Sequence, residues 1–428
     1  MRCEVELFKH QQDALDQTAL LHRVAYYHDM GLGKTFTGAE KMYQLGTKVN
    51  LVICQKSKVD DWCDHFRTHY PGYKIYNFTD NSKENKRQLE YGFWINYHNN
   101  STFPSVLVIN YDLVFRRPEL KKLKNFTLML DESSLIQNRK AKRSKFILSL
   151  NPDNVILLSG TPTGGKYENL WSQMQLLGWK ISESMFFNQY VDFHYDERQG
   201  FPVMIVDGYK NEERLKRKMR EHGCHFLKTD EVFDLPEQIE QTIKIDPSKE
   251  YLKFHKDGIV NVNGQDLIGD NILTRMLIER QLCGCYSSEK LEAFKDLVES
   301  TNDRIIVFYN FYAELRLMLE LIDRPISIVN GECKKLNCYE ESTNSITFIQ
   351  YQAGAMGLNL QKANKIVYFT PPLSSELFEQ SKKRIHRIGQ KRACFYYYLK
   401  VKGSIEDQIY KNLAMRRDYT DQLFQEEQ

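Results

Sequence analysis

Short apolar segments rich in Val, Ile, Leu and Phe recur along the chain, and each is followed by a mixed polar and apolar segment. Such runs, about four to eight residues long, are typical of strands buried on both faces in a parallel sheet. In the first half of the chain they lie at 24–28, 49–54, 106–110, 128–131 and 155–159. In the second half they lie at 305–309, 326–329, 346–350, 366–369 and 394–400. The mixed segments fit crossover helices, so the pattern predicts an α/β fold with two mostly parallel sheets flanked by helices.

The length of 428 residues favours two domains of roughly 200 residues each over one hydrophobic core. Between the two halves, the segment 168–220 has a mostly helical pattern, and 226–245 contains a strand-like stretch with Pro236. We place the boundary in this region. The expected domains are therefore 1–235, with a helical extension at its end, and 236–428.

Composition and charge narrow the class of protein without selecting a partner. Hydrophobic residues make up 42% and charged residues 27% of the chain, as in globular proteins, and the net charge of +3 neither requires nor excludes nucleic acid. No apolar run approaches the roughly 20 residues of a membrane helix, and no signal peptide or paired CxxC spacing is present. We expect a cytoplasmic protein of a bacterial or virus-infected cell, with the nucleus as a further possibility, and no membrane partner.

The segment DMGLGKT has the features of a loop that binds nucleotide phosphates, because it follows an apolar run and precedes a helix-like segment. Its glycines let the backbone approach an anion. Lys34 is expected to hold the β- and γ-phosphates, and the Thr35 hydroxyl to complete the shell of Mg²⁺. The other members of the loop are Asp29, Met30, Gly31, Leu32 and Gly33.

Two carboxylates, Asp131 and Glu132, follow the apolar run that begins at Leu128. Phosphoryl transfer needs chiefly positioning and neutralisation of charge. Asp131 is therefore expected to position Mg²⁺, and Glu132 to orient and deprotonate the attacking water. An acidic pair can also cap a helix, but together with Lys34 it indicates an ATPase.

These motifs together resemble the core of superfamily-two helicases, and specifically the SWI/SNF-type family of double-stranded DNA translocases. The resemblance covers nearly the whole chain, and its most specific element is QSKKRIHRIGQ at 380–390. It implies two tandem RecA-like domains that use ATP and Mg²⁺ to move along duplex DNA. Gln11 is similar to the family's adenine-recognising residue, and Gly357, in the motif QAGAMGLNL, is assigned to the nucleotide site.

The resemblance also assigns roles to the motif at 380–390. Arg387 is expected to be the arginine finger on the γ-phosphate, which contributes on the order of 10³-fold or more to the rate. Arg384 is its neighbour, and Gln390 is counted with the catalytic residues. Because they are three residues apart, the two arginines would share one face of an expected helix. An arginine supplied by the second lobe would link the nucleotide state to lobe closure.

Further motifs are similar to family segments that contact the phosphate backbone of DNA without sequence preference. The residues assigned to these contacts are Lys56, Ser57, Asn110, Tyr111, Asn310, Gln352, Ala353 and Gly354. Ser159, Gly160 and Thr161 resemble the motif that couples hydrolysis to lobe movement. The family usually has Ala or Gly and then His after the acidic pair, whereas this chain has Ser133 and Ser134.

The sequence thus predicts a monomeric, DNA-stimulated ATPase motor. It would translocate on double-stranded DNA and remodel DNA or protein–DNA complexes, with proteins bound to DNA as further partners. Two alternatives stay open at this point. One is a strand-separating DNA or RNA helicase, and the other is a nucleotide-gated DNA clamp with little hydrolysis.

Overall fold

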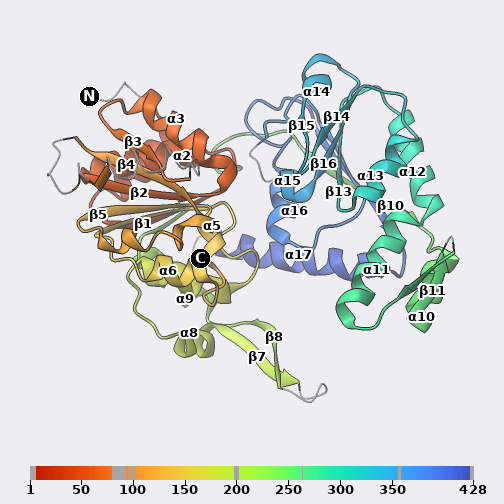
Figure 1. Ribbon diagram of the computed structural model, residues 1–428, viewed down its shortest axis with the longest axis horizontal. Coiled ribbons are helices and arrows are strands. Elements are labelled where there is room, and N and C mark those ends of the chain that lie inside the picture. Colours follow the sequence, from red (N-terminus) through yellow and green to blue (C-terminus); the bar gives the residue numbers. More distant parts are fainter. Residues whose placement is uncertain are drawn as a thin grey trace. The chain divides into compact units, whose positions relative to one another are not determined.

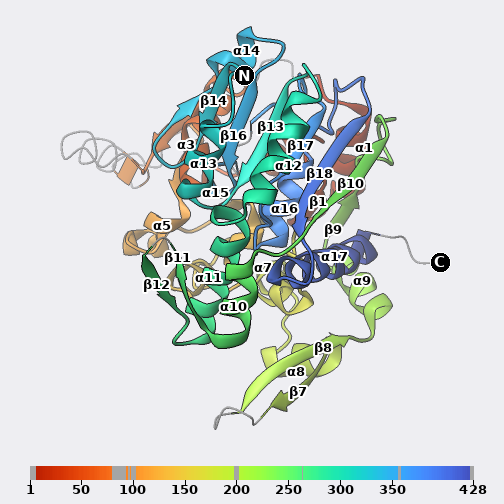
Figure 2. The ribbon, with the colours of Figure 1, turned by 90° about the vertical axis from the view of Figure 1, so that its right-hand side faces the viewer.

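The computed structural model describes residues 6–79, 93–94, 97, 103–196, 202–262, 264–354 and 358–424. The chain divides into two compact units: the first ends at Val232 and also includes the end of the last helix, from Tyr419, and the second is Phe233–Asp418. Each unit is built on one seven-stranded sheet. Figures 1 and 2 show the two sheets and the helices around them. The expected α/β class with two RecA-like sheets is confirmed. The functional boundary after residue 235 remains a prediction.

The sheet of the first unit has the strand order β3-β4-β2-β5-β6-β1-β9, and every neighbouring pair is parallel. Its strands are β1 (Arg23–His28), β2 (Val49–Cys54), β3 (Lys74–Asn77), β4 (Ser105–Asn110), β5 (Phe126–Asp131), β6 (Asn154–Leu158) and β9 (Cys224–Leu227). The five strands predicted from apolar runs are all present. The two that were not predicted, β3 and β9, are the edge strands, where burial is incomplete and the sequence is less apolar.

Helices cover both faces of this sheet (Figure 1). On one face lie α1 (Lys9–Gln17), α2 (Lys34–Leu45) and α3 (Val59–His69), which share a core with β1, β2 and β4–β6. On the other face lie α6 (Lys142–Leu148), α7 (Trp171–Leu176), α8 (Glu183–Tyr190) and α9 (Glu212–Glu221). Short helical turns join strands to these helices: η1 (Lys56–Lys58), α5 (Tyr111–Val114), η2 (Pro118–Lys122), η3 (Ser133–Ile136) and η4 (Tyr167–Leu170).

An antiparallel hairpin of β7 (Val191–Asp196) and β8 (Val203–Tyr209) extends from the first unit (Figure 2). The expectation of a mostly helical 168–220 was therefore wrong for this part, although α7 and α8 lie within the segment and η4 and α9 overlap its ends. Val191, Phe193 and Tyr195 alternate with polar residues. That period of two suits a strand with one exposed face.

The sheet of the second unit has the order β10-β18-β17-β13-β16-β14-β15, and only the short β14–β15 pair is antiparallel. Its strands are β10 (Gln238–Ile245), β13 (Ile305–Tyr309), β14 (Ile326–Val329), β15 (Lys334–Lys335), β16 (Ile346–Gln350), β17 (Lys365–Tyr368) and β18 (Cys394–Val401). All five strands predicted from apolar runs are present. The strand-like stretch before residue 245 forms β10.

Helices cover both faces of the second sheet as well. One face carries α10 (Lys249–Asp257), α11 (Ile272–Cys285), α12 (Ser288–Glu299) and α13 (Tyr312–Leu319), with the hairpin of β11 (Ile259–Val262) and β12 (Gln265–Ile268) beside them. The other carries α14 (Asn337–Glu341), α15 (Tyr351–Gly354), α16 (Ser375–Lys382) and α17 (Ile405–Phe424). Among the described residues, none of the helices has the length and apolar character that crossing a bilayer requires.

Gly284, near the end of α11, provides a test of packing in the second unit. A Cβ atom there would lie 2.1 Å from Glu314 Oε1 and 3.0 Å from Thr370 Cγ2. Ala normally stabilises a helix by about 1 kcal/mol relative to Gly. Here we expect Gly284→Ala to lower the free energy of unfolding by about 1–3 kcal/mol, because the core has no room. Urea denaturation measures the effect. Leu277→Ala, at an exposed position of the same helix, is the control, and equal or higher stability of Gly284→Ala would contradict the packing.

Candidate functional site

The candidate site of the first unit lies at the carboxyl edge of its sheet. Open parallel sheets bind their ligands at this edge. Because β6 lies between β5 and β1, the segment after β6 lies between those that follow β5 and β1. The three segments are the coupling residues from Ser159, the acidic pair Asp131 and Glu132, and the phosphate loop. The strand order thus brings together three motifs that are distant in the sequence.

Two glycines of the phosphate loop adopt conformations that other residues rarely reach. Gly31 has a φ of 93°, and Gly33, the N-cap of α2, has a φ of 71°. Both values lie in the left-handed region that favours glycine. A side chain on Gly33 would also lie 2.3 Å from Gln11 Nε2. Glycine at residue 33 therefore allows both the turn and the close approach of α1.

Side chains on both sides hold the phosphate loop in place. The Gln11 amide donates to the carbonyls of Leu32 and Gly33, both at 3.2 Å. On the other side, the backbone N–H and hydroxyl of Thr229 donate to Asp29 Oδ2 at 3.2 and 3.3 Å. Thr229 follows the edge strand β9. The loop is therefore fastened to α1 and to the edge of the sheet.

Lys34, the first residue of α2, turns its ammonium group back over the loop. Its Nζ donates to the carbonyls of His28 at 2.9 Å and Asp29 at 3.2 Å. Those carbonyls hold a cation at the carboxyl end of β1, beside the first turn of α2. The first turn of a helix also presents backbone N–H groups to anions. Lys34 and α2 together thus form an electropositive cradle of the kind a phosphate chain requires.

The acidic pair is held from two directions. Trp62 on α3 donates its indole N–H to Asp131 Oδ2 at 2.8 Å. The Tyr111 hydroxyl lies within 3.0 Å of the Asp131 carbonyl and 3.3 Å of the Glu132 carbonyl. Glu132 has a φ of 55°, which is strained for a residue with a side chain. Such strain persists where surrounding contacts maintain it, as the Tyr111 hydroxyl does here.

The coupling residues contact both neighbours. The Ser159 hydroxyl donates to Glu132 Oε2 at 3.4 Å and accepts from the Thr161 N–H at 3.1 Å. A Cβ atom on Gly160 would lie 3.4 Å from Lys34 Nζ and 3.2 Å from Met30 Cγ. One short segment therefore lies against the Lys34 ammonium on one side and bonds to the Glu132 carboxylate on the other.

The residues at this edge fit a magnesium ion that is bound together with phosphates. Mg²⁺ takes oxygen ligands and is usually held by one or two carboxylates plus substrate phosphates. Asp131 supplies a carboxylate, and Thr35, in the first turn of α2, a hydroxyl. Burial raises the pKa of Asp131, which the Trp62 hydrogen bond and Lys34 oppose. A cation would favour the ionised carboxylate. Among the residues that the structure describes, no group of three or more His, Cys, Asp or Glu side chains is arranged to hold a metal by itself.

The arginine motif of the second unit differs from the expected helix. Helix α16 ends at Lys382, so Arg384 and Arg387 lie in the turns that follow it. The physical reason is in the backbone hydrogen bonds. The Arg384 carbonyl accepts from the Leu360 N–H at 3.2 Å, and the Ile385 carbonyl accepts from Gln390 Nε2 at 3.3 Å. Carbonyls that a continuing helix would use are engaged by residues outside it.

Each polar residue of this motif has a distinct environment. Arg387 donates through Nη1 to Asn359 Oδ1, and burial lowers its pKa. Arg384 is buried. Gln390 is also buried, and its Nε2 donates to the carbonyls of Gln361 and Ala363 at 3.1 and 2.8 Å. Its Oε1 accepts from the backbone N–H groups of the two residues that follow it. The Gln390 amide therefore holds the loop that carries the arginines.

The residues predicted to contact DNA fall into exposed and buried groups. Lys56 and Ser57 are exposed in η1, directly after β2, and Gln352 is exposed in α15 with Gly354 at the end of the same helix. By contrast, the buried ones are Asn110, Tyr111 and Ala353. Gly357 lies outside the described residues.

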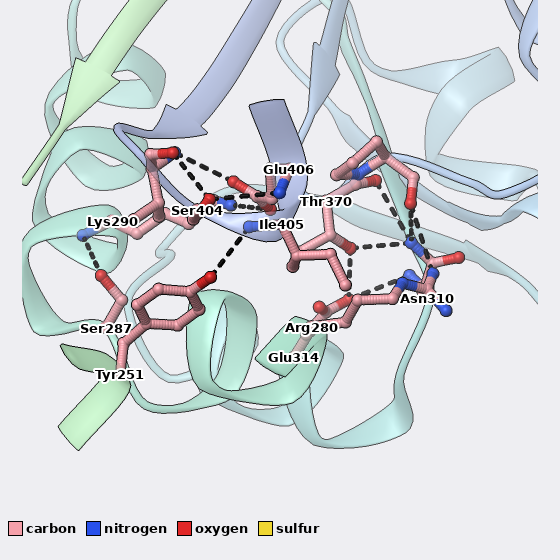
Figure 3. Close-up of polar contacts among 12 residues, drawn as sticks. Tyr251, Arg280, Ser287, Lys290, Asn310, Glu314, Thr370, Ser404, Ile405 and Glu406 are labelled. Carbon is pink, nitrogen blue, oxygen red and sulfur yellow. Dashed lines mark hydrogen bonds and ion pairs between the residues drawn. The ribbon is translucent and has the colours of Figure 1, made fainter. Parts of the chain in front are cut away.

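Asn310, directly after β13, belongs to a buried polar cluster (Figure 3). Its Nδ2 donates to Thr370 Oγ1 at 2.9 Å and to the Pro371 carbonyl at 3.0 Å. Glu314 Oε2 accepts from the N–H groups of Asn310 and Phe311, at 2.9 and 3.0 Å, and from the Thr370 hydroxyl at 3.1 Å. Burial raises the pKa of Glu314. The cluster ties the segments after β13 and β17 together, and the Asn310 amide is engaged within it.

Sequence reasoning missed several residues that shape these sites. Trp62 is one of them, and its spacing with Val59 and Phe66 marks one buried helix face. A buried Trp usually finds a partner for its N–H, so this signal was available. Thr229 gave no signal, because it acts through a contact with a segment 200 residues away. Glu314 accepts from N–H groups three and four residues before it at the start of α13, so a local signal was available for it.

Comparisons with known proteins cover nearly the whole chain. The profile of the SNF2-related domain matches residues 24–287, and that of the helicase conserved C-terminal domain matches residues 289–389. A solved structure described as the Sulfolobus solfataricus SWI2/SNF2 ATPase core in complex with dsDNA is 21% identical, with a TM-score of 0.47. That match covers 98% of this chain and 93% of the solved one.

Curated relatives are longer than this chain. The putative ATP-dependent helicase/translocase YwqA of Bacillus subtilis (strain 168) is 24% identical over 93% of this chain and 46% of its own length. The CHD3-type chromatin-remodeling factor CHR7 of Arabidopsis thaliana is 22% identical, over 89% of this chain and 34% of its own length. The Caenorhabditis elegans homologue of the SWI/SNF-related regulator of chromatin subfamily A-like protein 1 is 22% identical, over 94% of this chain and 59% of its own length. The chain thus spans about a third to three fifths of these relatives.

A buried histidine pair beside the phosphate loop makes stability depend on pH. His28 Nε2 and His225 Nδ1 lie 2.9 Å apart. Burial, and then the neighbouring His225 and Lys34, hold the pKa of His28 well below its usual 6.5, and burial lowers the pKa of His225. Below about pH 6.5 the unfolded chain therefore binds more protons than the folded one, and the free energy of unfolding falls.

We expect that free energy to fall with acidification by up to about 1.4 kcal/mol per pH unit for each histidine. Urea denaturation between about pH 7.5 and 5.5 measures the slope. His225→Gln should make it shallower, because one of the titrating groups is gone. Equal slopes in the wild type and in His225→Gln would contradict the assignment.

Proposed function

The chain belongs to the SNF2-related domain family, and from this membership we propose that it is an ATP-hydrolysing motor that moves along double-stranded DNA. The family match confirms the resemblance inferred from the motifs. Movement along the duplex would remodel DNA or displace proteins bound to it. Supporting this, relatives that carry the same core are named as ATP-dependent helicase/translocase and chromatin-remodeling factor.

One observation carries the proposal: the segment from Ser159 to Thr161 contacts both the phosphate loop and the acidic pair. Gly160 lies beside Lys34, and Ser159 donates to Glu132. A γ-phosphate held by Lys34 and attacked by water on Glu132 would have this segment as its immediate neighbour. Loss of that phosphate changes the charge between the two contacts, which is how nucleotide hydrolysis moves switch segments in general.

We assign the residues of this edge as follows. The loop Asp29, Met30, Gly31, Leu32 and Gly33 and the Lys34 ammonium hold the triphosphate, and Gln11 helps to recognise the base. Thr35 and Asp131 hold Mg²⁺, which when bound neutralises phosphate charge. Glu132 accepts a proton from the attacking water. The hydrogen bond from Ser159 favours the ionised carboxylate, which is the form that a base requires.

Arg387 is assigned to the γ-phosphate in the transition state, with Arg384 beside it. Support comes from the position of both residues in turns whose shape the Gln390 side-chain amide maintains through hydrogen bonds to backbone carbonyls. We therefore propose that Gln390 contributes to catalysis by positioning the arginines. Gly357 remains a predicted nucleotide contact.

For DNA, we propose that the segments after β2, β4, β13 and β16 follow the phosphate backbone. Among the assigned residues, Lys56, Ser57 and Gln352 have exposed side chains, so direct contact is assigned to them. Asn110, Tyr111 and Asn310 act through the segments that they hold, and the helix turn of Ala353 and Gly354 supplies backbone groups. Contacts of this kind give affinity without sequence preference.

A second candidate function is a nucleotide-gated clamp on DNA with little hydrolysis. The observation that favours it is the pair Ser133 and Ser134, which are fully buried where the family usually has a small residue followed by His. A strand-separating helicase is a further candidate, since the same core is compatible with it. The clamp differs from the motor by its failure to move, and the helicase by its separation of strands.

Two substitutions test the assigned ATP chemistry. Lys34→Ala should abolish ATP binding and hydrolysis while the fold is kept, because the cation on the phosphates is lost. Arg387→Ala should keep ATP binding and reduce turnover by at least about a hundredfold, since a finger acts on the transition state. Nucleotide titration, steady-state hydrolysis and thermal melts of both variants measure this. Normal turnover in Lys34→Ala, or lost binding with normal turnover in Arg387→Ala, would contradict the assignments.

The choice of nucleic acid tests the proposed partner. Hydrolysis by the full chain should be stimulated by duplex DNA more than by single-stranded DNA or RNA of the same length, and without dependence on sequence. Because phosphate contacts dominate such binding, raising the salt concentration should weaken the stimulation. Steady-state ATPase rates over a titration of each nucleic acid give the comparison. Stimulation by RNA alone would contradict the proposal.

A further inference from the structure

A buried side-chain amide, that of Gln173 on α7, lies next to both the acidic pair and the coupling segment. Its Oε1 accepts two hydrogen bonds, from the Ser133 hydroxyl at 2.7 Å and from the Tyr27 hydroxyl at 3.0 Å. Its Nε2 donates to the carbonyl of Pro162 at 2.8 Å. Gln173, Ser133 and Tyr27 are fully buried. The amide thus uses its acceptor twice and its donor once, away from solvent.

The partners of Gln173 come from segments that flank the hydrolysis chemistry. Ser133 directly follows Glu132 and begins the turn η3. Pro162 directly follows Thr161, at the end of the coupling segment. Besides the Ser159 hydroxyl, Gln173 therefore makes a second connection between the acidic pair and the coupling segment, through the Ser133 hydroxyl on one side and the Pro162 carbonyl on the other. The Tyr27 hydroxyl of β1 bonds to the same amide oxygen but belongs to neither of these two segments.

We propose that Gln173 is a positioning residue that transmits the state of the acidic pair to the coupling segment, with Ser133 as its contact on the acidic side. The proposal rests on the proposed function. A displacement of the turn at Ser133 moves the amide oxygen of Gln173. Because the amide group is planar and rigid, its nitrogen moves as well, and the Pro162 carbonyl bonded to that nitrogen is displaced. Ala or Gly at residue 133 would have no hydroxyl for this bond. The connection is therefore a consequence of the departure from the family pattern at this position.

A merely structural role would also be consistent with a buried amide, because loss of one partner leaves a polar group unsatisfied. Stability alone therefore cannot separate the two roles. The chain offers a matched pair of variants, since Ser133→Ala and Tyr27→Phe each remove one hydroxyl from the same Gln173 oxygen. Only Ser133 belongs to the turn of the acidic pair. Tyr27 is a buried residue near the end of β1, outside the assigned nucleotide and DNA contacts.

The experiment measures ATP turnover of the full chain with saturating duplex DNA and without DNA. The ratio of the two rates reports coupling, and thermal melts report folding. In Ser133→Ala the ratio should fall by about tenfold, a factor that corresponds to the loss of one buried hydrogen bond, with little change in the KM for ATP. Gln173→Met should lower it at least as much. In Tyr27→Phe the ratio should stay within about twofold of the wild type, although the loss of stability is similar.

The experiment distinguishes a result that overturns the positioning role of Gln173 from one that overturns the proposed function. If duplex DNA stimulates the wild type and the ratio in Ser133→Ala is unchanged, or falls equally in Tyr27→Phe, the positioning role is overturned and the motor stands. If Gln173→Met does not fold, the two hydroxyl variants still decide between these outcomes. If no nucleic acid stimulates the wild type at all, the proposed function itself is overturned.

Discussion

The parallel alignment of β5, β6 and β1 is the constraint on which the candidate site depends. Leu158, the last residue of β6, pairs with Asp131 of β5 and with Tyr26 of β1. The three strands therefore end close together, and the residues that follow them lie next to one another as a direct result. Between its neighbours, the segment after β6 has room for Gly160 but little for a side chain, because a Cβ atom would meet Lys34 and Met30.

Buried hydrogen bonds convert this proximity into a defined geometry. Trp62 and Tyr111 hold the acidic pair from opposite elements, and Tyr111 bonds to the carbonyls on either side of the strained Glu132 backbone. A backbone in this conformation costs on the order of 1 kcal/mol or more and persists only where its surroundings enforce it. Ser159 bonds to the Glu132 carboxylate, and Gln173 bonds to Ser133, the residue after it. The coupling segment therefore shares most movements of the acidic pair.

Much of this arrangement was predictable from the sequence, because local patterns carry it. Apolar runs located the ten central strands, and the phosphate loop and acidic pair were recognisable from residue type and spacing next to those runs. The roles of the individual site residues stay predictions. Edge strands such as β9 were missed, since half-buried strands are less apolar. The helix expected through Arg387 was wrong, because Gln390 and Leu360 compete for its backbone carbonyls.

Residues whose importance lies in a distant partner could not be found in this way. Gln173 bonds to groups 40 and 146 residues before it, and nothing in the neighbouring sequence marks it. Tyr111 illustrates the converse. The motif that contains it suggested a DNA contact, but its burial places its hydroxyl on the acidic pair. Sequence motifs therefore locate functional segments more reliably than they identify which atoms of a segment make the functional contacts.

Movement along duplex DNA is the central claim, and displacement of a third strand from a DNA triplex measures it most directly. The chain would be supplied with ATP and a duplex that carries a triplex-forming strand at some distance from the loading end. The account predicts displacement that requires ATP and Glu132, that is delayed as the distance increases, and that leaves the duplex strands paired. Duplex-stimulated hydrolysis without displacement would contradict it and favour the clamp, and separation of the duplex strands would favour a helicase.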